Sequence, residues 1–308
     1  MTKKAYFYID DTFWVLRDIT RQRPEKLFDN PFLKMLKNAH DNYGLKAQLN
    51  LFYRADSFYG YDQFTLADVT DAYKAEFEDA SDWLKFAFHA LEEFPDYPHV
   101  NATYEDTKWL FEIIKKEVLR FAGEKSFTYT TCPHWLPTSK DGVRALKDCG
   151  VKLMDATAGD VEEYNGDPNS LPYGHAFRLL NNRQPETKLF TRKTRDAAIS
   201  RSICGYNHLT QEQWDEIYDT TKKIYDEETG ILFKKFNSTL LNATPFEEME
   251  EEYAPLLDRE YVGICIHEQY FYADYFAYQP DFADKVNKMC EILTGAGFKF
   301  INGDEILE

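Results

Sequence analysis

Two adjacent aspartates that follow an apolar segment are the residues of this sequence best placed for chemistry. Residues 6–9 form a short hydrophobic stretch, and Asp10 and Asp11 come directly after it. In parallel α/β folds, ligands bind beyond the carboxyl ends of the strands, so this acid pair lies where a reaction would take place. On extended backbone the two side chains point to opposite sides, which allows one acid to hold a metal ion while the other contacts substrate or water. The alternative is structural, with Asp11 or Thr12 capping a helix.

Histidines and glutamates follow a second apolar segment, residues 85–89. His89 ends this segment, and Glu93 and His99 come soon after it. Imidazole and carboxylate groups bind divalent metal ions, so this segment can form an open metal site with an aspartate from another strand. The competing interpretation makes His89 a hydrogen-bonded structural residue.

A third group of polar residues comes after residues 127–130, where the chain reads Cys132-Pro133-His134-Trp135. His134 can bind a metal ion or the substrate, and Trp135 can stack on the apolar face of a sugar ring. A turn that begins at the proline and packs the tryptophan explains this motif equally well.

The fourth group follows residues 264–266, an apolar run of the kind found in buried strands. His267 comes next and can protonate a leaving group, because the unperturbed pKa of histidine is close to neutral pH. Glu268 stands beside it, where it can contact substrate. Four segment ends that each carry an acid or an imidazole together favour a functional site.

These segments belong to a regular alternation of strand-length apolar runs and amphipathic stretches, which predicts βα units and a largely parallel sheet. The predicted strands are residues 5–9, 47–53, 85–89, 127–130, 151–154, 261–267 and 298–301. They suit a (β/α) barrel of seven or eight strands, complete or distorted, whose strand ends meet at one face. We expect a single α/β domain over residues 1–308, with an inserted loop or hairpin at residues 156–200.

The composition argues against several classes of partner. With a net charge of −17, the chain repels phosphate backbones and anionic lipids, so we expect no nucleic acid and no membrane partner. No stretch approaches about 18 consecutive apolar residues and the first residues lack a secretory signal, so a cytoplasmic protein is expected. The five cysteines are odd in number and widely spaced, which is typical of buried thiols rather than of a disulfide framework or a cysteine-based zinc site.

The order of the four motifs resembles the polysaccharide deacetylase family, which consists of carbohydrate esterases built on a distorted (β/α) barrel. Residues 8–11, 89–93, 132–135 and 264–267 resemble its Asp-Asp strand, His-rich second motif, aromatic third motif and late Leu-x-His motif. The resemblance implies a hydrolase that removes acetyl groups from a carbohydrate or a related small molecule. It also implies that Asp11 binds a divalent metal ion, with zinc expected, that Asp10 is the general base and that His267 is the general acid.

Two departures from the family pattern bear on the metal ligands. The family's second motif supplies two histidines four residues apart, whereas this chain has Glu93 four residues after His89. A carboxylate can replace an imidazole, which makes Asp11, His89 and Glu93 the expected ligands; the alternative is that no metal binds. The third motif offers His134 in place of the family's arginine, so either the site is rebuilt around His134 or the deacetylase chemistry has been lost.

Two rival functions remain open. In the first, Asp10 and Glu268 are the acid and base of a metal-independent glycoside hydrolase, whose carboxylates lie within about 5 to 10 Å of each other. In the second, the barrel only binds sugars, through Trp135 and the aromatic residues of 270–278. Those aromatic residues also fit a packing role or a contact between copies of the chain, so a homo-oligomer is compatible with the sequence.

Overall fold

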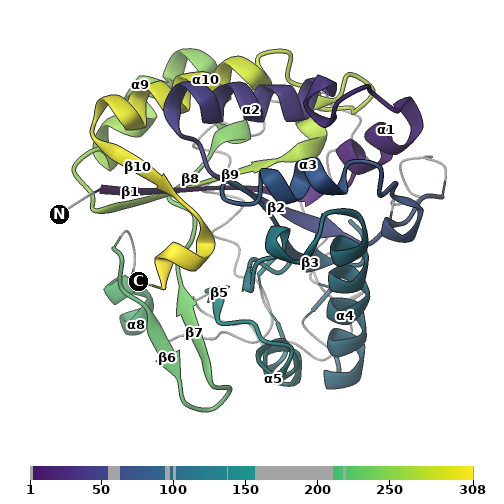
Figure 1. Ribbon diagram of the computed structural model, residues 1–308. Coiled ribbons are helices and arrows are strands. Elements are labelled where there is room, and N and C mark those ends of the chain that lie inside the picture. The colour runs from purple at the N-terminus through teal and green to yellow at the C-terminus, as the bar shows by residue number, and fades with distance from the viewer. Residues whose placement is uncertain are drawn as a thin grey trace.

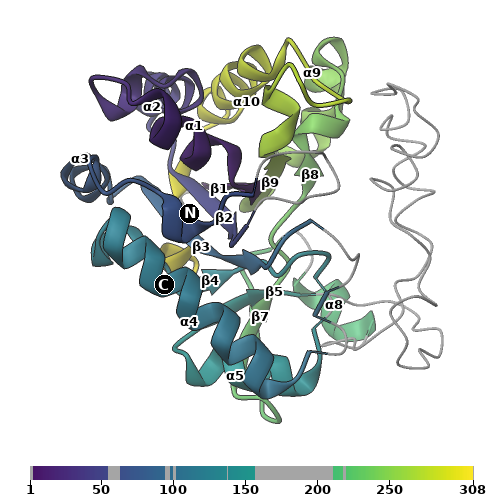
Figure 2. The ribbon, with the colours of Figure 1, turned by 90° about the vertical axis from the view of Figure 1, so that its right-hand side faces the viewer.

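The computed structural model describes residues 3–54, 63–93, 98–99, 102–136, 138–156, 211–217 and 220–307. Its strands occupy the middle of the molecule and its helices lie outside them (Figure 1, Figure 2). The predicted insertion falls almost entirely on residues 157–200, which lie outside the described residues. Of the helices that the structure describes, none is long and apolar enough to cross a membrane.

The strands form two sheets that are parallel except for one hairpin. The strands are β1 (Lys3–Thr12), β2 (Ala47–Phe52), β3 (Leu84–Ala90), β4 (Thr130–Thr131), β5 (Leu153–Asp155), β6 (Ile224–Asp226), β7 (Ile231–Lys234), β8 (Thr239–Leu240), β9 (Tyr261–His267) and β10 (Phe298–Ile301). The six-stranded sheet has the order β3-β2-β1-β9-β8, with β10 also paired to β1, and the four-stranded sheet has the order β4-β5-β7-β6. Among the strands of the described residues, only β6 and β7 pair antiparallel. The prediction of an α/β fold with a largely parallel sheet is confirmed, whereas a closed barrel is not.

A main-chain hydrogen bond outside the ladders joins the two sheets at one margin. The Thr128 N–H donates to the Phe86 carbonyl at 2.9 Å, beside β3 and β4. Side chains from both sheets, among them Tyr6, Leu153 and Tyr261, belong to one apolar cluster. The sheets therefore enclose a common interior, although their strands do not form one continuous ladder.

Strand β1 is buried on both faces, and each face meets a different part of the core. Ala5 and Ile9 belong to the large apolar cluster shared with the helices, while Tyr6 and Tyr8 belong to a smaller cluster drawn from β1, β5, β9 and β10. Since side chains alternate along a strand, Asp10 continues the series of Tyr6 and Tyr8. The strand thus carries an acid to the end of the interior between the sheets.

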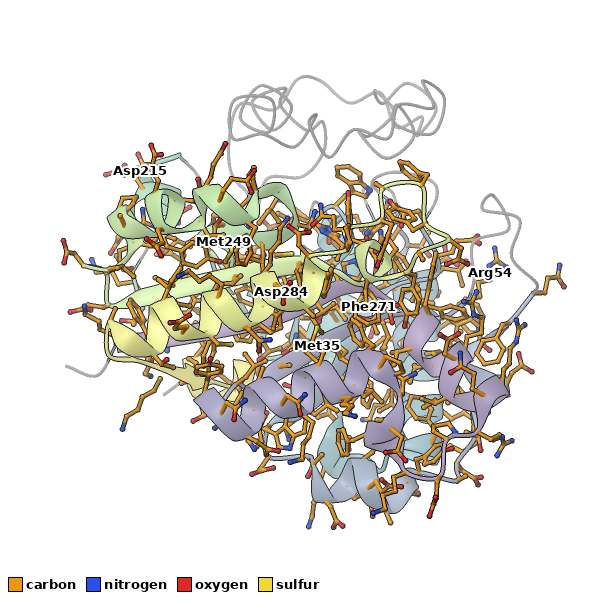
Figure 3. The ribbon with its side chains drawn as sticks, turned by 90° about the horizontal axis from the view of Figure 1, so that it is seen from above. Met35, Arg54, Asp215, Met249, Phe271 and Asp284 are labelled. Atoms are coloured by element: carbon orange, nitrogen blue, oxygen red, sulfur yellow. The ribbon has the colours of Figure 1, made fainter. Side chains whose placement is uncertain are left out.

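The helices cover the outer faces of the sheets. They are α1 (Trp14–Gln22), α2 (Pro31–Tyr43), α3 (Lys74–Asp79), α4 (Tyr104–Phe121), α5 (Lys140–Asp148), α8 (Gln211–Ile217), α9 (Met249–Tyr253) and α10 (Phe282–Gly295). Figure 3 shows α2 and α10 side by side, with Met35 and Asp284 marking them. Phe271 packs between these helices, with its ring 5.2 Å from Phe32 and 5.5 Å from Phe282. For this part of the aromatic segment 270–278, packing is the observed role.

Side-chain caps mark where two of the helices begin. Asn30 Oδ1 accepts hydrogen bonds from the Phe32 and Leu33 N–H groups at 3.0 and 3.2 Å, at the start of α2. Thr103 Oγ1 accepts one from the Asp106 N–H at 3.1 Å, at the start of α4. Each bond satisfies a donor that the first helical turn leaves without a partner.

Candidate metal centre

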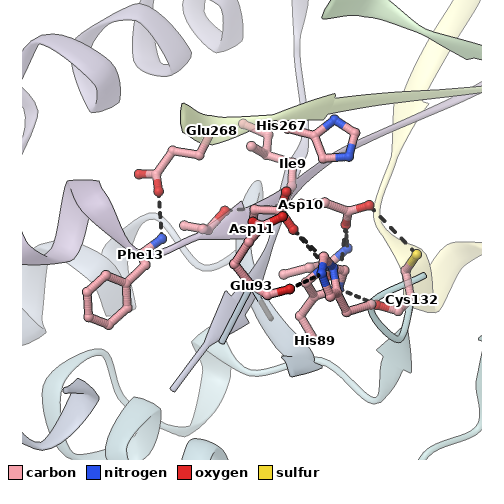
Figure 4. A network of polar contacts seen from close by, with 12 residues as sticks. Ile9, Asp10, Asp11, Phe13, His89, Glu93, Cys132, His267 and Glu268 are labelled. Atoms are coloured by element: carbon pink, nitrogen blue, oxygen red, sulfur yellow. Dashed lines mark hydrogen bonds and ion pairs between the residues drawn. The ribbon is translucent and has the colours of Figure 1, made fainter. Parts of the chain in front are cut away.

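The backbone at the end of β1 turns both aspartates toward one imidazole. Asp11 has a φ of 59°, in the left-handed region, and the pairing of β1 with β2 shifts register between Ile9 and Thr12. Such irregularities redirect side chains at the rims of sheets. Asp10 Oδ1 lies 3.8 Å from His89 Nδ1, and Asp11 Oδ1 lies 3.1 Å from His89 Nε2. The expectation of opposite directions was therefore wrong, because it assumed extended backbone (Figure 4).

Three potential ligand atoms from different segments converge beyond the strand ends. His89 Nε2 lies 3.1 Å from Asp11 Oδ1, and His134 Nδ1 lies 3.2 Å from the same oxygen. The two ring nitrogens are themselves 3.1 Å apart. All three side chains are buried, so water contributes little to their solvation.

The remaining nitrogen of each imidazole is occupied by a main-chain carbonyl. His89 Nδ1 is 2.5 Å from the Cys132 oxygen, and His134 Nε2 is 3.0 Å from the Glu93 oxygen. A carbonyl only accepts hydrogen bonds, so each of these nitrogens carries an N–H group. In the neutral form of the rings, the lone pairs of His89 Nε2 and His134 Nδ1 face each other and the Asp11 carboxylate, an arrangement that a cation stabilises.

The spacing of these three atoms fits a metal ion. Zinc binds histidine nitrogen at about 2.0–2.1 Å in tetrahedral geometry, which separates neighbouring ligand atoms by about 3.3 Å. The carbonyl partners of His89 and His134 match the outer hydrogen bonds that orient metal-binding imidazoles. A donor set of two imidazoles and one carboxylate suits zinc or cobalt.

The predicted ligand set needs one correction. Glu93 reaches the centre through its main-chain oxygen, and its carboxylate belongs to none of the candidate ligand groups among the described residues. His99 belongs to none of these groups either, and its Nε2 lies 2.8 Å from the His89 carbonyl at the end of β3. His134, which was expected to bind either a metal ion or the substrate, lies beside Asp11 and His89.

Asp10 and His267, the predicted base and acid, lie next to this centre. Asn50 Nδ2 donates to Asp10 Oδ1 at 2.6 Å, and Cys265 Sγ lies 3.3 Å from Asp10 Oδ2. His267 is opposite Asp10 in the register of β1 and β9 and is half-buried. Its Nδ1 lies 3.0 Å from Asn242 Oδ1, so the Asn242 oxygen can fix the imidazole with its N–H on that side.

The electrostatics of the centre follow from its closely spaced charges. Burial by itself raises the pKa of Asp11, but the charge and hydrogen bond of His134 hold that pKa well below its usual value. Burial lowers the pKa of His89, because it disfavours the charged imidazole. The negative charges of Asp10 and Asp11 outweigh this effect, so the pKa of His89 is raised overall. Asp11 is accordingly an ionised carboxylate at neutral pH, which is the form that binds metal.

Glu268 has a different role from the predicted one. Its carboxylate accepts hydrogen bonds from the N–H groups of Phe13, Trp14 and Val15 at 2.6–2.7 Å, so it caps the start of α1 (Figure 4). The side chain is fully buried, and this burial raises its pKa to about 7 although the three hydrogen bonds lower it. The structure thus directs Glu268 at a helix and not at a substrate.

Trp135 and Gln269 complete the surroundings of the centre. Trp135 is half-buried, with its indole 5.9 Å from the His134 ring, and its φ of 63° turns the chain sharply after His134. Gln269 Nε2 donates to Asp11 Oδ2 at 2.8 Å. Sequence reasoning missed Gln269 and Asn50, although Asn50 is a polar residue inside an apolar predicted strand and could have been singled out on that ground.

Comparisons with known proteins support the α/β fold but do not assign the chain to a family. No family model matches the chain, and no curated protein matches it. A family 4 acetyl xylan esterase from Clostridium thermocellum, in complex with a cobalt ion, covers 99% of this chain and 90% of its own, at 12% identity and a TM-score of 0.42. A family 4 carbohydrate esterase from Bacillus anthracis covers 99% and 83%, at 11% identity and a TM-score of 0.38.

A 4-alpha-glucanotransferase from Thermococcus litoralis covers 100% of this chain, at 11% identity and a TM-score of 0.54. The match spans 40% of the glucanotransferase, so this chain corresponds to about two fifths of that protein's length. What the two proteins share is the α/β fold.

Proposed function

We propose that this protein is a metal-dependent hydrolase that removes an acetyl group from a carbohydrate or a related small molecule. The main observation behind the proposal is that Asp11 Oδ1, His89 Nε2 and His134 Nδ1 lie 3.1–3.2 Å from one another. In addition, the other nitrogen of each imidazole is hydrogen-bonded to a main-chain carbonyl. The acetylated carbohydrate substrate rests on the resemblance of the four sequence motifs to the polysaccharide deacetylases.

In the proposed reaction Asp11, His89 and His134 would hold a divalent ion. Such an ion would polarise the acetyl carbonyl and lower the pKa of a water molecule. Asp10 accepts a proton from the attacking water, and His267 donates a proton to the departing oxygen or nitrogen of the sugar. The products are acetate and the free hydroxyl or amine.

The rival glycoside hydrolase mechanism requires Glu268 to exchange a proton with substrate. Its three hydrogen bonds to the start of α1 weigh against that role. A protein that only binds sugars would have no turnover, so activity measurements separate this second rival from an enzyme.

Metal analysis and acetate release test the proposal together. We expect about one zinc or cobalt ion per wild-type chain and metal-dependent release of acetate from acetylated xylo- or chito-oligosaccharides. Asp11→Asn and His134→Gln should each weaken metal binding and lower kcat by at least about 100-fold, because each removes one ligand of three.

The matched control is His40→Gln. His40 is half-buried against Trp83, with its Nδ1 2.8 Å from the Leu45 oxygen, and belongs to none of the candidate ligand groups among the described residues. This variant should retain metal and activity. Wild-type protein that takes up no zinc, cobalt or nickel would rule out the proposed mechanism, and metal-loaded protein that releases no acetate would rule out the proposed activity.

A further inference from the structure

A different carboxamide holds each of the two adjacent aspartates. Asn50 Nδ2 donates to Asp10 Oδ1 at 2.6 Å, and Gln269 Nε2 donates to Asp11 Oδ2 at 2.8 Å. Asn50 is 0% exposed and Gln269 is 6% exposed. Buried amides of this kind stay oriented, because turning them would leave polar groups without partners.

The Asn50 amide is itself fixed by a second amide on the same strand. Gln48 Nε2 donates to Asn50 Oδ1 at 2.8 Å and lies 3.1 Å from the Thr130 oxygen. Residues 48 and 50 share one face of β2, since side chains alternate along a strand. Because Asn50 Oδ1 is occupied by a donor, its Nδ2 must face Asp10.

Gln269 is positioned by the turn that also caps α1. It follows Glu268, whose carboxylate is bound to the first N–H groups of that helix. Gln269 donates a hydrogen bond to Asp11 Oδ2, and the other oxygen, Asp11 Oδ1, lies 3.1 Å from His89 Nε2. The hydrogen bond thereby selects which oxygen of Asp11 enters the metal centre.

We propose that Asn50 and Gln269 are positioning residues that assign different tasks to two chemically identical neighbours. Gln269 presents Asp11 as a metal ligand. Asn50 holds Asp10 on the Nδ1 side of the His89 ring, where Asp10 Oδ1 lies 3.8 Å from that nitrogen, and so keeps Asp10 off the ion and available as the base. The part concerning Asp10 rests on the proposed function, whereas the part concerning Asp11 requires only that the site binds metal.

Two substitutions of similar volume test the two halves separately. Gln269→Met should raise the dissociation constant for zinc by about 10- to 100-fold, as loss of an outer hydrogen bond to a ligand typically does. Asn50→Leu should keep zinc affinity within about threefold but lower kcat by about 100-fold with little change in KM, because the base is misplaced.

Cobalt-substituted protein gives a second measurement that does not require activity. Once freed by Asn50→Leu, Asp10 can join the ion as an extra ligand, and the visible absorption should fall because higher coordination numbers absorb weakly. In Gln269→Met the absorption of the cobalt-saturated protein should remain close to that of the wild type.

Asn30→Ala is the control for a lost buried amide, because Asn30 caps α2 and should change stability while leaving metal affinity and kcat unchanged. The positioning roles are wrong if Asn50→Leu and Gln269→Met both change the same quantity, zinc affinity or kcat, or if neither variant differs from wild type. This conclusion holds even if the wild-type protein proves to be a metal-dependent deacetylase. If the wild type binds metal but releases no acetate, the proposed function fails, and the zinc affinities with the cobalt spectra still decide this inference. Protein that binds no metal overturns both.

Discussion

His99 and His134 are both buried histidines near the end of β3, with 3% and 5% of their surface exposed, yet their surroundings give them different roles. His134 faces the Asp11 carboxylate at 3.2 Å. His99 is hydrogen-bonded to the His89 carbonyl, and burial lowers the pKa of His99 from 6.5 to about 3. The His99 imidazole is therefore uncharged near neutral pH, and it supports the end of β3 through its hydrogen bond to the His89 carbonyl. The different roles of the two histidines depend on neighbours that are distant in sequence.

The pKa of His99 predicts part of the acid sensitivity of the fold. The folded state resists protonation of His99 until about pH 3, whereas the unfolded chain protonates it near pH 6.5. Unfolding thus takes up a proton between these pH values, so the free energy of unfolding falls as the pH is lowered through that window, by up to about 4 kcal/mol from this group.

His99→Gln keeps a side-chain donor for the His89 carbonyl but cannot titrate. Urea unfolding from pH 7 to pH 3 should therefore show a flatter decline in stability for His99→Gln than for wild type. The variant His40→Gln, outside the centre, serves as the comparison. An acid decline of equal steepness in His99→Gln and wild type would contradict this account.

At the scale of elements, the accuracy of the strand predictions depended on the length of the apolar run in each strand. The predicted bounds of β9 and β10, residues 261–267 and 298–301, match the structure, because each reads as a distinct apolar run. The short strands β6, β7 and β8 were not predicted, because two to four residues carry too little periodicity. Residues 226–228 include the end of β6 and the turn toward β7.

The close approach of β9 to the chain before β8 gives a prediction for a single glycine. A Cβ atom added at Gly263 would lie 1.5 Å from the Phe236 carbonyl oxygen, so Gly263→Ala must push β9 away from its neighbour. We expect a loss of about 3 kcal/mol or more in stability.

Gly295→Ala is the matched substitution for this measurement. Nothing lies within 4 Å of a Cβ atom at Gly295, which is the last residue of α10. Chemical denaturation should show unchanged or slightly higher stability for this variant. Equal effects of the two substitutions would mean that the close approach at Gly263 does not constrain the fold.

At the scale of the whole molecule, the candidate centre connects β1, the end of β3 and the segment after β4, which belong to both sheets. A metal ion bound there stabilises the folded state by mass action, by about 2.7 kcal/mol at a free concentration 100 times its dissociation constant. Zinc should therefore raise the melting temperature of wild-type protein by several degrees in differential scanning calorimetry, and a chelator should reverse the rise. Asp11→Asn should melt at the same temperature with and without zinc.

The sequence by itself determined that the fold is α/β with a largely parallel sheet, and that acids and imidazoles follow several of its strands. These properties follow from local patterns of hydrophobicity along the chain. Only the tertiary structure decided that His134 and not Glu93 meets Asp11 and His89, and that Glu268 caps α1. The physical reason is that the left-handed backbone at Asp11 and the relative placement of the two sheets determine which side chains converge, and neither is encoded by spacing along a single segment.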